Sequence, residues 1–181
     1  MGEPKQLLQF HGQSLLLHAV NEAVNANFSS VIVVLGANAA VLEKEINEKK
    51  VNIIENKEWK EGMATSVRLG LNTLLKINPS ADAVIFMVCD QPFVSASLLK
   101  ELIIKQRETG KPVVTSSYGE TVGSPALFHK NMFQELLQLK GDAGARKIIE
   151  QHMSEVAIVS FPKGSIDIDT MKDYEGLFQL N

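Results

Sequence analysis

Short runs of β-branched and apolar residues alternate with amphipathic stretches along almost the whole chain, and this alternation constrains the fold more than any other feature. The apolar runs predict strands over residues 31–35, 51–56, 83–88, 112–116 and 156–161. The stretches between them predict helices over residues 14–27, 38–49, 63–76, 95–109 and 130–139. Strands that alternate with helices form βαβ units. We therefore expect an α/β fold around a mainly parallel sheet.

Length and composition exclude several classes of protein. A chain of 181 residues is of the size of one domain, so we expect a single domain over residues 1–181. The net charge is -3 and no basic cluster stands out, which argues against nucleic acid as a partner. No apolar run reaches the roughly 18 residues of a membrane span. A single cysteine, Cys89, excludes an internal disulfide and fits a reducing compartment, so we expect a cytoplasmic protein.

The residues that follow each predicted strand are the first candidates for a site, because ligands of open α/β sheets bind at the carboxyl ends of the strands. Cys89-Asp90-Gln91-Pro92 comes directly after the apolar strand 83–88. An Asp in this position could hold a Mg²⁺ that substrate phosphates also bind. The alternative is that Asp90 caps the helix that starts near Ser95.

Three further segments carry residues of similar promise. Gly62 before a helix lets backbone N–H groups approach a ligand, and Ser66 could add a hydroxyl, although an ordinary glycine turn is the alternative.

Asp167 and Asp169 would face one side of an extended segment and could share a cation, or they could form a solvated edge. Residues 141–146 open another helix, for which Asp142 would be the cap. The turn-rich segment 116–125 is expected to form a loop or hairpin over a site.

These segments together resemble the molybdenum-cofactor cytidylyltransferases, within the wider family of MobA-like nucleotidyltransferases. The resemblance covers residues 1–174. It rests on six motifs in this order: M-G-x-P-K-x-L-L, N-x-x-W-x-x-G-M-x-x-S, D-Q-P, G-S-P-x-L-F, G-D-x-G-A-R and D-I-D-T.

The resemblance implies a Rossmann-like nucleotidyltransferase fold in three layers, α/β/α, with a mostly parallel sheet. It implies transfer of CMP from CTP to the molybdopterin form of the molybdenum cofactor, with release of pyrophosphate. The product would serve a molybdenum hydroxylase such as xanthine dehydrogenase. Two alternatives remain: a non-catalytic accessory protein that binds molybdenum cofactor, and a related nucleotidyltransferase that uses GTP or another phosphate acceptor.

The resemblance also assigns roles to residues of this chain. Lys5 and Asp90 would be catalytic, with Lys5 on the triphosphate. The nucleotide would be bound by Gly2, Pro4, Lys5, Gly62, Met63, Ser66 and Asp90. The acceptor would be bound by Gly123, Pro125, Asp142 and Arg146. The metal, Mg²⁺, would be held by Asp90, Asp167 and Asp169. The histidines show no spacing typical of metal ligands and receive no role.

Two departures from the family pattern carry further expectations. Cys89 stands where many relatives have Gly, and we expect a small buried residue, with a redox role as the alternative. Relatives also carry L-A-A-G-x-S-x-R directly before M-G-x-P-K. That segment supplies the first strand, which belongs between the strands 31–35 and 83–88. We therefore expect that this chain is N-terminally truncated relative to the family, and that its sheet has two unpaired inner edges.

Overall fold

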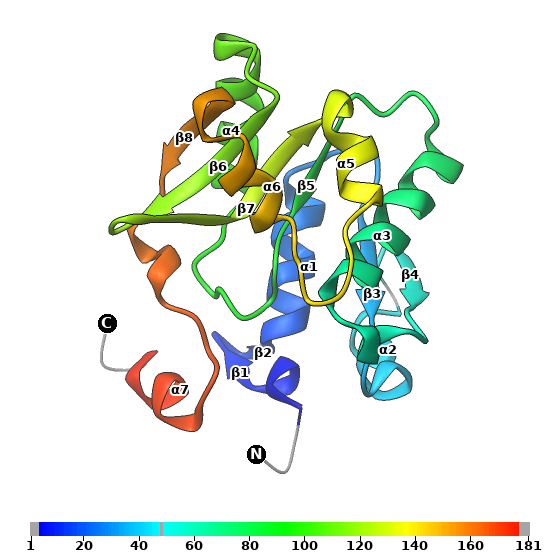
Figure 1. Ribbon diagram of the computed structural model, residues 1–181. Coiled ribbons are helices and arrows are strands. Elements are labelled where there is room, and N and C mark those ends of the chain that lie inside the picture. Colours follow the sequence, from blue (N-terminus) through cyan, green and yellow to red (C-terminus); the bar gives the residue numbers. More distant parts are fainter. Residues whose placement is uncertain (1–3, 48, 178–181) are drawn as a thin grey trace.

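The computed structural model describes residues 4–47 and 49–177, and it shows helices on both faces of a layer of strands (Figure 1). The strands are β1 (Gln9–Phe10), β2 (Gln13–Ser14), β3 (Ile32–Leu35), β4 (Asn52–Glu55), β5 (Ala83–Phe86), β6 (Val113–Tyr118), β7 (Thr121–His129) and β8 (Val156–Ser160). The helices are α1 (Leu15–Asn25), α2 (Ala39–Ile46), α3 (Met63–Ile77), α4 (Ala96–Thr109), α5 (Phe133–Leu137), α6 (Arg146–Gln151) and α7 (Met171–Leu177). The predicted strands and helices are confirmed, with ends that differ by a few residues. None of the helices in the described part is both long and apolar enough to span a bilayer.

The described strands form three sheets, and the largest of them is mixed rather than mainly parallel. β1 and β2 pair only with each other, as an antiparallel N-terminal hairpin. β5, β7, β6 and β8 pair in that order, and β7 runs antiparallel to both of its neighbours. The pairs β6–β8 and β3–β4 are parallel. The segment 116–125 is a hairpin, as expected, but its second strand continues to His129, which the sequence did not predict.

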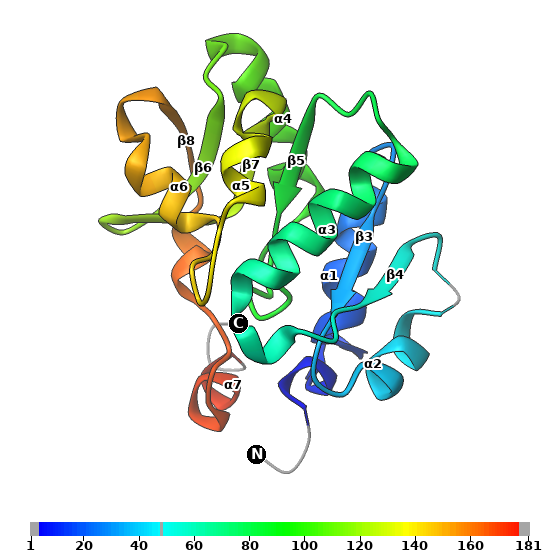
Figure 2. The ribbon, with the colours of Figure 1, turned by 45° about the vertical axis from the view of Figure 1, so that its right-hand side comes forward.

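Helices cover both faces of the strands (Figures 1 and 2), and the side chains of the sheet alternate between these two layers. On β7, Phe128 packs with α3, α5 and α6, whereas its neighbour Leu127 packs with α4. Val113 and Val114 of β6 divide between the two layers in the same way. α1 lies on the α4 side, where it also packs with α2 and β3. The architecture is therefore three-layered.

β3 and β5 are neighbours in the fold but do not pair with each other. β3 pairs only with β4, and β5 only with β7, among the described strands. Both strands nevertheless pack against α3 on one face, through Ile32 and Val84, and against α1 on the other, through Val33 and Ile85. β3 and β5 thus share both covering helices but form no hydrogen bonds with each other. The edges that they turn towards each other are unpaired among the described strands, as expected.

Burial of the side chains agrees with this reading. Every residue of β5 is only half-buried, as are the first three residues of β3. In contrast, Leu127 and Phe128 of the fully paired strand β7 have no exposed surface. An apolar strand inside a sheet is normally covered on both sides. A further strand between β3 and β5 would complete this coverage, and it stays a prediction.

A half-buried histidine gives the stability of this fold a predicted pH dependence. His152, after α6, lies 2.8 Å from Glu135 Oε2 through Nε2 and 3.3 Å from Glu155 Oε2 through Nδ1. These hydrogen bonds, first that to Glu135 and then that to Glu155, raise the pKa of His152 above its ordinary value. Charged His152 is thus stabilised in the folded state. Its contribution to the free energy of unfolding is fully present below the unfolded-state pKa of about 6.5. The contribution is lost as the pH rises through the raised pKa of the folded state.

We therefore expect His152→Gln to lower the free energy of unfolding at about pH 5.5 by ~0.2–1 kcal/mol, the range of exposed ion pairs, and much less at about pH 8.5. Urea unfolding of the two proteins at both pH values measures the difference. An equal effect at both pH values would contradict the ion pair.

Candidate active site

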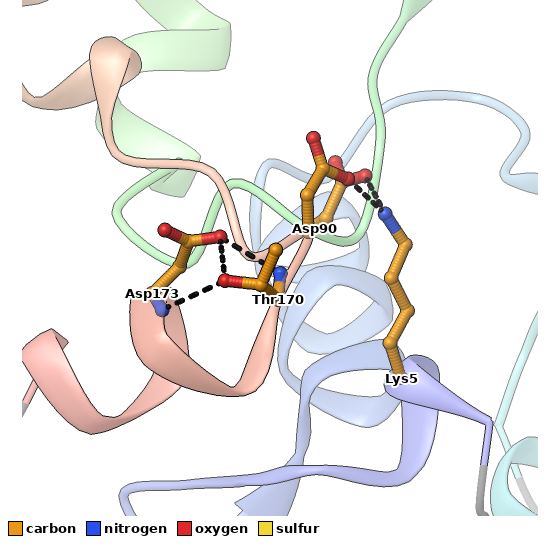
Figure 3. A network of polar contacts seen from close by, with 5 residues as sticks. Lys5, Asp90, Thr170 and Asp173 are labelled. Carbon is orange, nitrogen blue, oxygen red and sulfur yellow. Dashed lines mark hydrogen bonds and ion pairs between the residues drawn. The ribbon is translucent and has the colours of Figure 1, made fainter. Parts of the chain in front are cut away.

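Lys5 lies between two carboxylates that come from distant parts of the chain (Figure 3). Its Nζ is 2.8 Å from Asp90 Oδ2 and 2.7 Å from Asp169 Oδ1. The side chains of Lys5 and Asp90 are about three-quarters buried, whereas Asp169 is mostly exposed. Burial disfavours the charge on Lys5, but the hydrogen bonds to Asp169 and Asp90 outweigh it and raise the pKa of Lys5 above its ordinary value. Lys5 is therefore a permanent cation held by two anions.

Local structure explains how these three side chains meet. Lys5 begins a short 3₁₀ turn, Lys5–Leu7, whose first bond runs from Leu7 N to the carbonyl of Pro4. Asp90 follows β5, at the strand end where the sequence predicted a site. The segment with Asp169 is fixed by its neighbour Ile168, which is fully buried and donates its N–H to the Asp90 carbonyl at 2.9 Å.

Directly after Asp169, the residues Thr170 and Asp173 form a capping box (Figure 3). Thr170 N and Oγ1 both donate to Asp173 Oδ2 at 2.7 Å, and Asp173 N donates back to Thr170 Oγ1 at 3.2 Å. This reciprocal pair starts α7. Asp169 is thus clamped between a buried isoleucine and a helix start, which directs its carboxylate towards Lys5.

Asp167 behaves differently from Asp169. It is exposed, and no hydrogen bond or ion pair joins it to another residue that the structure describes. Of the expected pair, only Asp169 therefore binds Lys5 together with Asp90. A metal role of Asp167 stays a prediction.

A second cluster forms at the start of α3. Gly62 has φ 106°, and a Cβ at this position would overlap the backbone of Gly141. The N–H of Ala64 donates to the Gly141 carbonyl at 3.1 Å. Gly144 lies against Met63 in the same way. The loop 141–145 therefore rests on the helix start, and it brings the segment expected for the acceptor next to the segment expected for the nucleotide.

Asn56 is a functional candidate that the sequence reasoning missed. It is 3% exposed, and its side-chain N–H groups donate to Thr65 Oγ1 at 2.8 Å and to Ser66 Oγ at 2.9 Å. Its Oδ1 accepts from Glu58 N at 3.0 Å. Because Asn56 occupies the Ser66 oxygen as a donor, the Ser66 hydroxyl hydrogen remains available to donate to a ligand. The position of Asn56 at the carboxyl end of the predicted strand 51–56 was the signal that could have found it.

The expected acceptor residues fall into two separate groups. Gly123 and Pro125 are buried in β7, where their carbonyls accept from Thr115 Oγ1 at 2.7 Å and Ser116 Oγ at 2.8 Å. Arg146 is exposed and pairs with Glu150 at 3.0 Å. Asp142 is exposed and does not cap α6, whose N-cap is Ala145. Their acceptor role stays a prediction, and Gly2 lies outside the described residues.

The residues around Lys5 fit a divalent cation. Asp90 and Asp169 already surround one positive charge, and carboxylate oxygens are the ligands that Mg²⁺ prefers. No cluster of three or more acidic, histidine or cysteine side chains in the described part could hold a metal by itself. Mg²⁺ needs only one or two carboxylates when substrate phosphates supply further oxygens. The donor set therefore suits a cation shared with a phosphate ligand.

Cys89 has the environment of a structural residue. It is half-buried against the cluster formed by α1, α2 and β3. Burial, with a smaller effect of Asp90, raises the pKa of Cys89 to about 11. A thiol is nucleophilic only as the thiolate. This environment favours the small buried residue over the redox role.

We expect iodoacetamide to alkylate Cys89 of the native protein about a hundred-fold more slowly than free cysteine, because the raised pKa lowers the thiolate fraction by that factor. The rate can be followed by mass spectrometry, with the urea-unfolded chain as control. Alkylation faster than that of free cysteine would support the redox role.

A model of one protein family, described as the MobA-like NTP transferase domain, matches residues 1–156. The chain belongs to this family. The resemblance noted in the sequence is thereby confirmed at the level of the family, and the domain is a MobA-like nucleotidyltransferase.

Named relatives of this MobA-like chain are distant. It is 26% identical over 180 residues to nicotine blue oxidoreductase of Paenarthrobacter nicotinovorans, covering 93% of this chain and 85% of that one. It is 25% identical over 185 residues to the purine catabolism protein PucB of Bacillus subtilis (strain 168), covering 97% and 88%.

A solved structure shares the whole architecture. Rv0371c of Mycobacterium tuberculosis H37Rv superposes with a TM-score of 0.84 at 27% identity, covering 99% of this chain and 90% of that one. The same protein has also been solved as a complex with manganese, with a TM-score of 0.81 and 26% identity over 97% and 91% of the two chains. The three-layer nucleotidyltransferase-like fold is thus shown.

Proposed function

We propose that this MobA-like domain transfers CMP from CTP to the molybdopterin form of the molybdenum cofactor and releases pyrophosphate. The observation that carries the proposal is the placement of Lys5 between Asp90 and Asp169 at the end of β5. A fixed cation beside two metal-binding carboxylates suits a triphosphate substrate. The manganese complex of the similar mycobacterial protein supports a divalent cation here, and we propose Mg²⁺, held by Asp90 and Asp169.

In the proposed reaction, a terminal phosphate oxygen of the acceptor attacks the α-phosphorus of CTP. A new P–O bond forms, and the bond to the oxygen that bridges the α- and β-phosphorus breaks. The electron pair of that bond leaves with pyrophosphate. No general base is needed, because the attacking phosphate is already an anion. Catalysis therefore depends on positioning and on neutralising charge.

Each residue of the site has a place in this scheme. Lys5 exchanges its carboxylate partners for the β- and γ-phosphates and balances the charge of the leaving group. When bound, Mg²⁺ supplies further positive charge beside the leaving pyrophosphate. The Ser66 hydroxyl, oriented by Asn56, donates to the base or ribose. The loop 141–145 and the β6–β7 hairpin face the acceptor.

The end use of the product is part of the proposal. One relative is named for purine catabolism, and this name supports a purine-oxidising molybdenum hydroxylase such as xanthine dehydrogenase as the recipient. We propose that transfer takes place in the cytoplasm, where nucleoside triphosphates are available.

Pyrophosphate release from CTP, Mg²⁺ and molybdopterin tests the proposal directly. We expect release with CTP and at least tenfold less with GTP or ATP. If only GTP gave release, the nucleotide substrate would be GTP instead of CTP. If release required a different phosphate acceptor, the acceptor substrate would not be molybdopterin. Binding of molybdenum cofactor without any release would favour the non-catalytic accessory protein.

A further inference from the structure

The turn that carries Asp90 is fastened to α1 by a histidine for which the proposed reaction has no role. His18, on α1, has its Nε2 2.8 Å from the carbonyl oxygen of Pro92. Its other ring nitrogen, Nδ1, lies 3.1 Å from Nε2 of Gln13, on β2. His18 therefore links the helix and the N-terminal hairpin to the residues directly after the catalytic carboxylate.

The surrounding hydrogen bonds fix which ring nitrogen carries the proton. Asn21 Nδ2 donates to Gln13 Oε1 at 2.7 Å, so the NH₂ group of Gln13 faces His18. A side-chain NH₂ can only donate, so His18 Nδ1 must accept. A carbonyl oxygen can only accept, so Nε2 carries the hydrogen and donates it to Pro92. The hydrogen bonds from Asn21 through Gln13 and His18 to Pro92 thus all run in one direction, with Nε2 of His18 as the last donor.

Aromatic packing holds the same ring in place. Phe10 meets the His18 ring edge-on, with ring centroids 5.1 Å apart, and meets Phe93 at 5.8 Å. Phe10 is 6% exposed. The histidine therefore cannot turn away from Pro92 without disturbing a buried aromatic cluster.

The turn itself is a junction of several segments. The Asp90 carbonyl accepts from Ile168 N at 2.9 Å, and Gln91 Nε2 donates to the Gly164 carbonyl at 2.9 Å. Pro92 has no N–H of its own. The bond from His18 thus joins this turn directly to α1, in addition to the bonds from Ile168 and to Gly164.

We propose that His18 is a positioning residue, whose Nε2–H holds the Asp90–Pro92 turn so that the Asp90 carboxylate faces Lys5 and Asp169. This inference rests on the proposed function, because Asp90 is taken as a metal ligand. Groups behind a metal ligand commonly change metal affinity or activity by about 10–100-fold. Loss of the Nε2 donor leaves the Pro92 carbonyl without its hydrogen bond from His18. The Asp90 carboxylate is then held less firmly towards Lys5 and Asp169.

Matched substitutions separate the hydrogen bond from the packing. Gln carries an N–H donor as many bonds from Cα as Nε2 of His, so His18→Gln keeps the bond to Pro92. His18→Asn places its amide at the position of Nδ1 and loses that bond, and His18→Phe keeps the ring alone. We expect Asn and Phe to weaken binding of Mn²⁺ by about tenfold or more, and Gln to stay within about threefold of the wild type.

Mn²⁺ binding in the presence of a CTP analogue that cannot release pyrophosphate, followed by electron paramagnetic resonance, is the main measurement, and circular dichroism checks the fold. Equal affinity in all variants would overturn the proposal, as would a loss in Gln as large as in Asn. ¹⁵N NMR of the His18 ring in the wild type gives an independent result. A ring with its hydrogen on Nδ1 at neutral pH would also overturn it. Neither measurement needs turnover. Intact Mn²⁺ binding without pyrophosphate release would therefore refute the proposed reaction but not the positioning role of His18.

Discussion

Replacing Asp90 by Asn should lower the rate of pyrophosphate release by about three orders of magnitude or more, because the change removes both the proposed metal ligand and the charge that pairs with Lys5. Asn has the same shape, and its Oδ1 can still accept from Lys5, so the fold should persist. The measurement is the rate of pyrophosphate release with CTP, Mg²⁺ and molybdopterin at saturating concentrations. Unfolding in urea reports whether the fold is intact.

Asp82 provides the matched control. It lies directly before β5, at the opposite end of the strand from Asp90, and pairs with Lys130 at 2.8 Å on the surface. Asp82→Asn should leave turnover unchanged. If Asp90→Asn, or the more severe Asp90→Ala, kept activity within about tenfold of the wild type, Asp90 would not belong to the metal site.

Extending the chain upstream of Met1 with an apolar strand and the family segment L-A-A-G-x-S-x-R should raise the free energy of unfolding by several kcal/mol. The reason is the unpaired edges of β3 and β5, whose apolar side chains are half-buried. About four large apolar side chains, each worth roughly 1.5–3 kcal/mol on burial, give an upper estimate of about 6–12 kcal/mol. A typical domain has a total stability of about 5–15 kcal/mol, so the effect would be large.

Urea unfolding measures this gain, and hydrogen exchange locates it. The amide protons of β3 and β5 should exchange more slowly once both edges are paired. The control is an extension of equal length in which Ser and Lys replace the apolar residues. If both extensions gave the same stability and the same exchange, no strand would fit between β3 and β5.

The β6–β7 hairpin shows where local sequence reasoning fell short. Gly123, Ser124 and Pro125 have the composition of a turn, yet they lie inside β7. The register shifts between Thr115 and Ser116 on the neighbouring strand, and the hydroxyls of these two residues bond the carbonyls of Gly123 and Pro125. Side chains from another strand thus compensate for poor strand formers. Such compensation depends on pairing partners and is invisible in a local pattern.

The site divides in a similar way. Lys5 and Asp90 could be proposed from residue type, position after a strand and the order of motifs. The choice between Asp167 and Asp169 could not, because both face the same side of an extended segment in the sequence pattern. That choice follows from the bond between Ile168 N and the Asp90 carbonyl and from the capping box at Thr170.

The sequence by itself determined the alternation of strands and helices and indicated the family, because hydrophobic periodicity and motif order are properties of the local chain. Only the tertiary structure decided which carboxylates meet Lys5, and that Asn56 and His18 orient groups of the site. Lys5 is 85 residues from Asp90 and 164 residues from Asp169 along the chain. Contacts over such separations are set by the packing of buried residues and by directional hydrogen bonds, which no short stretch of sequence contains.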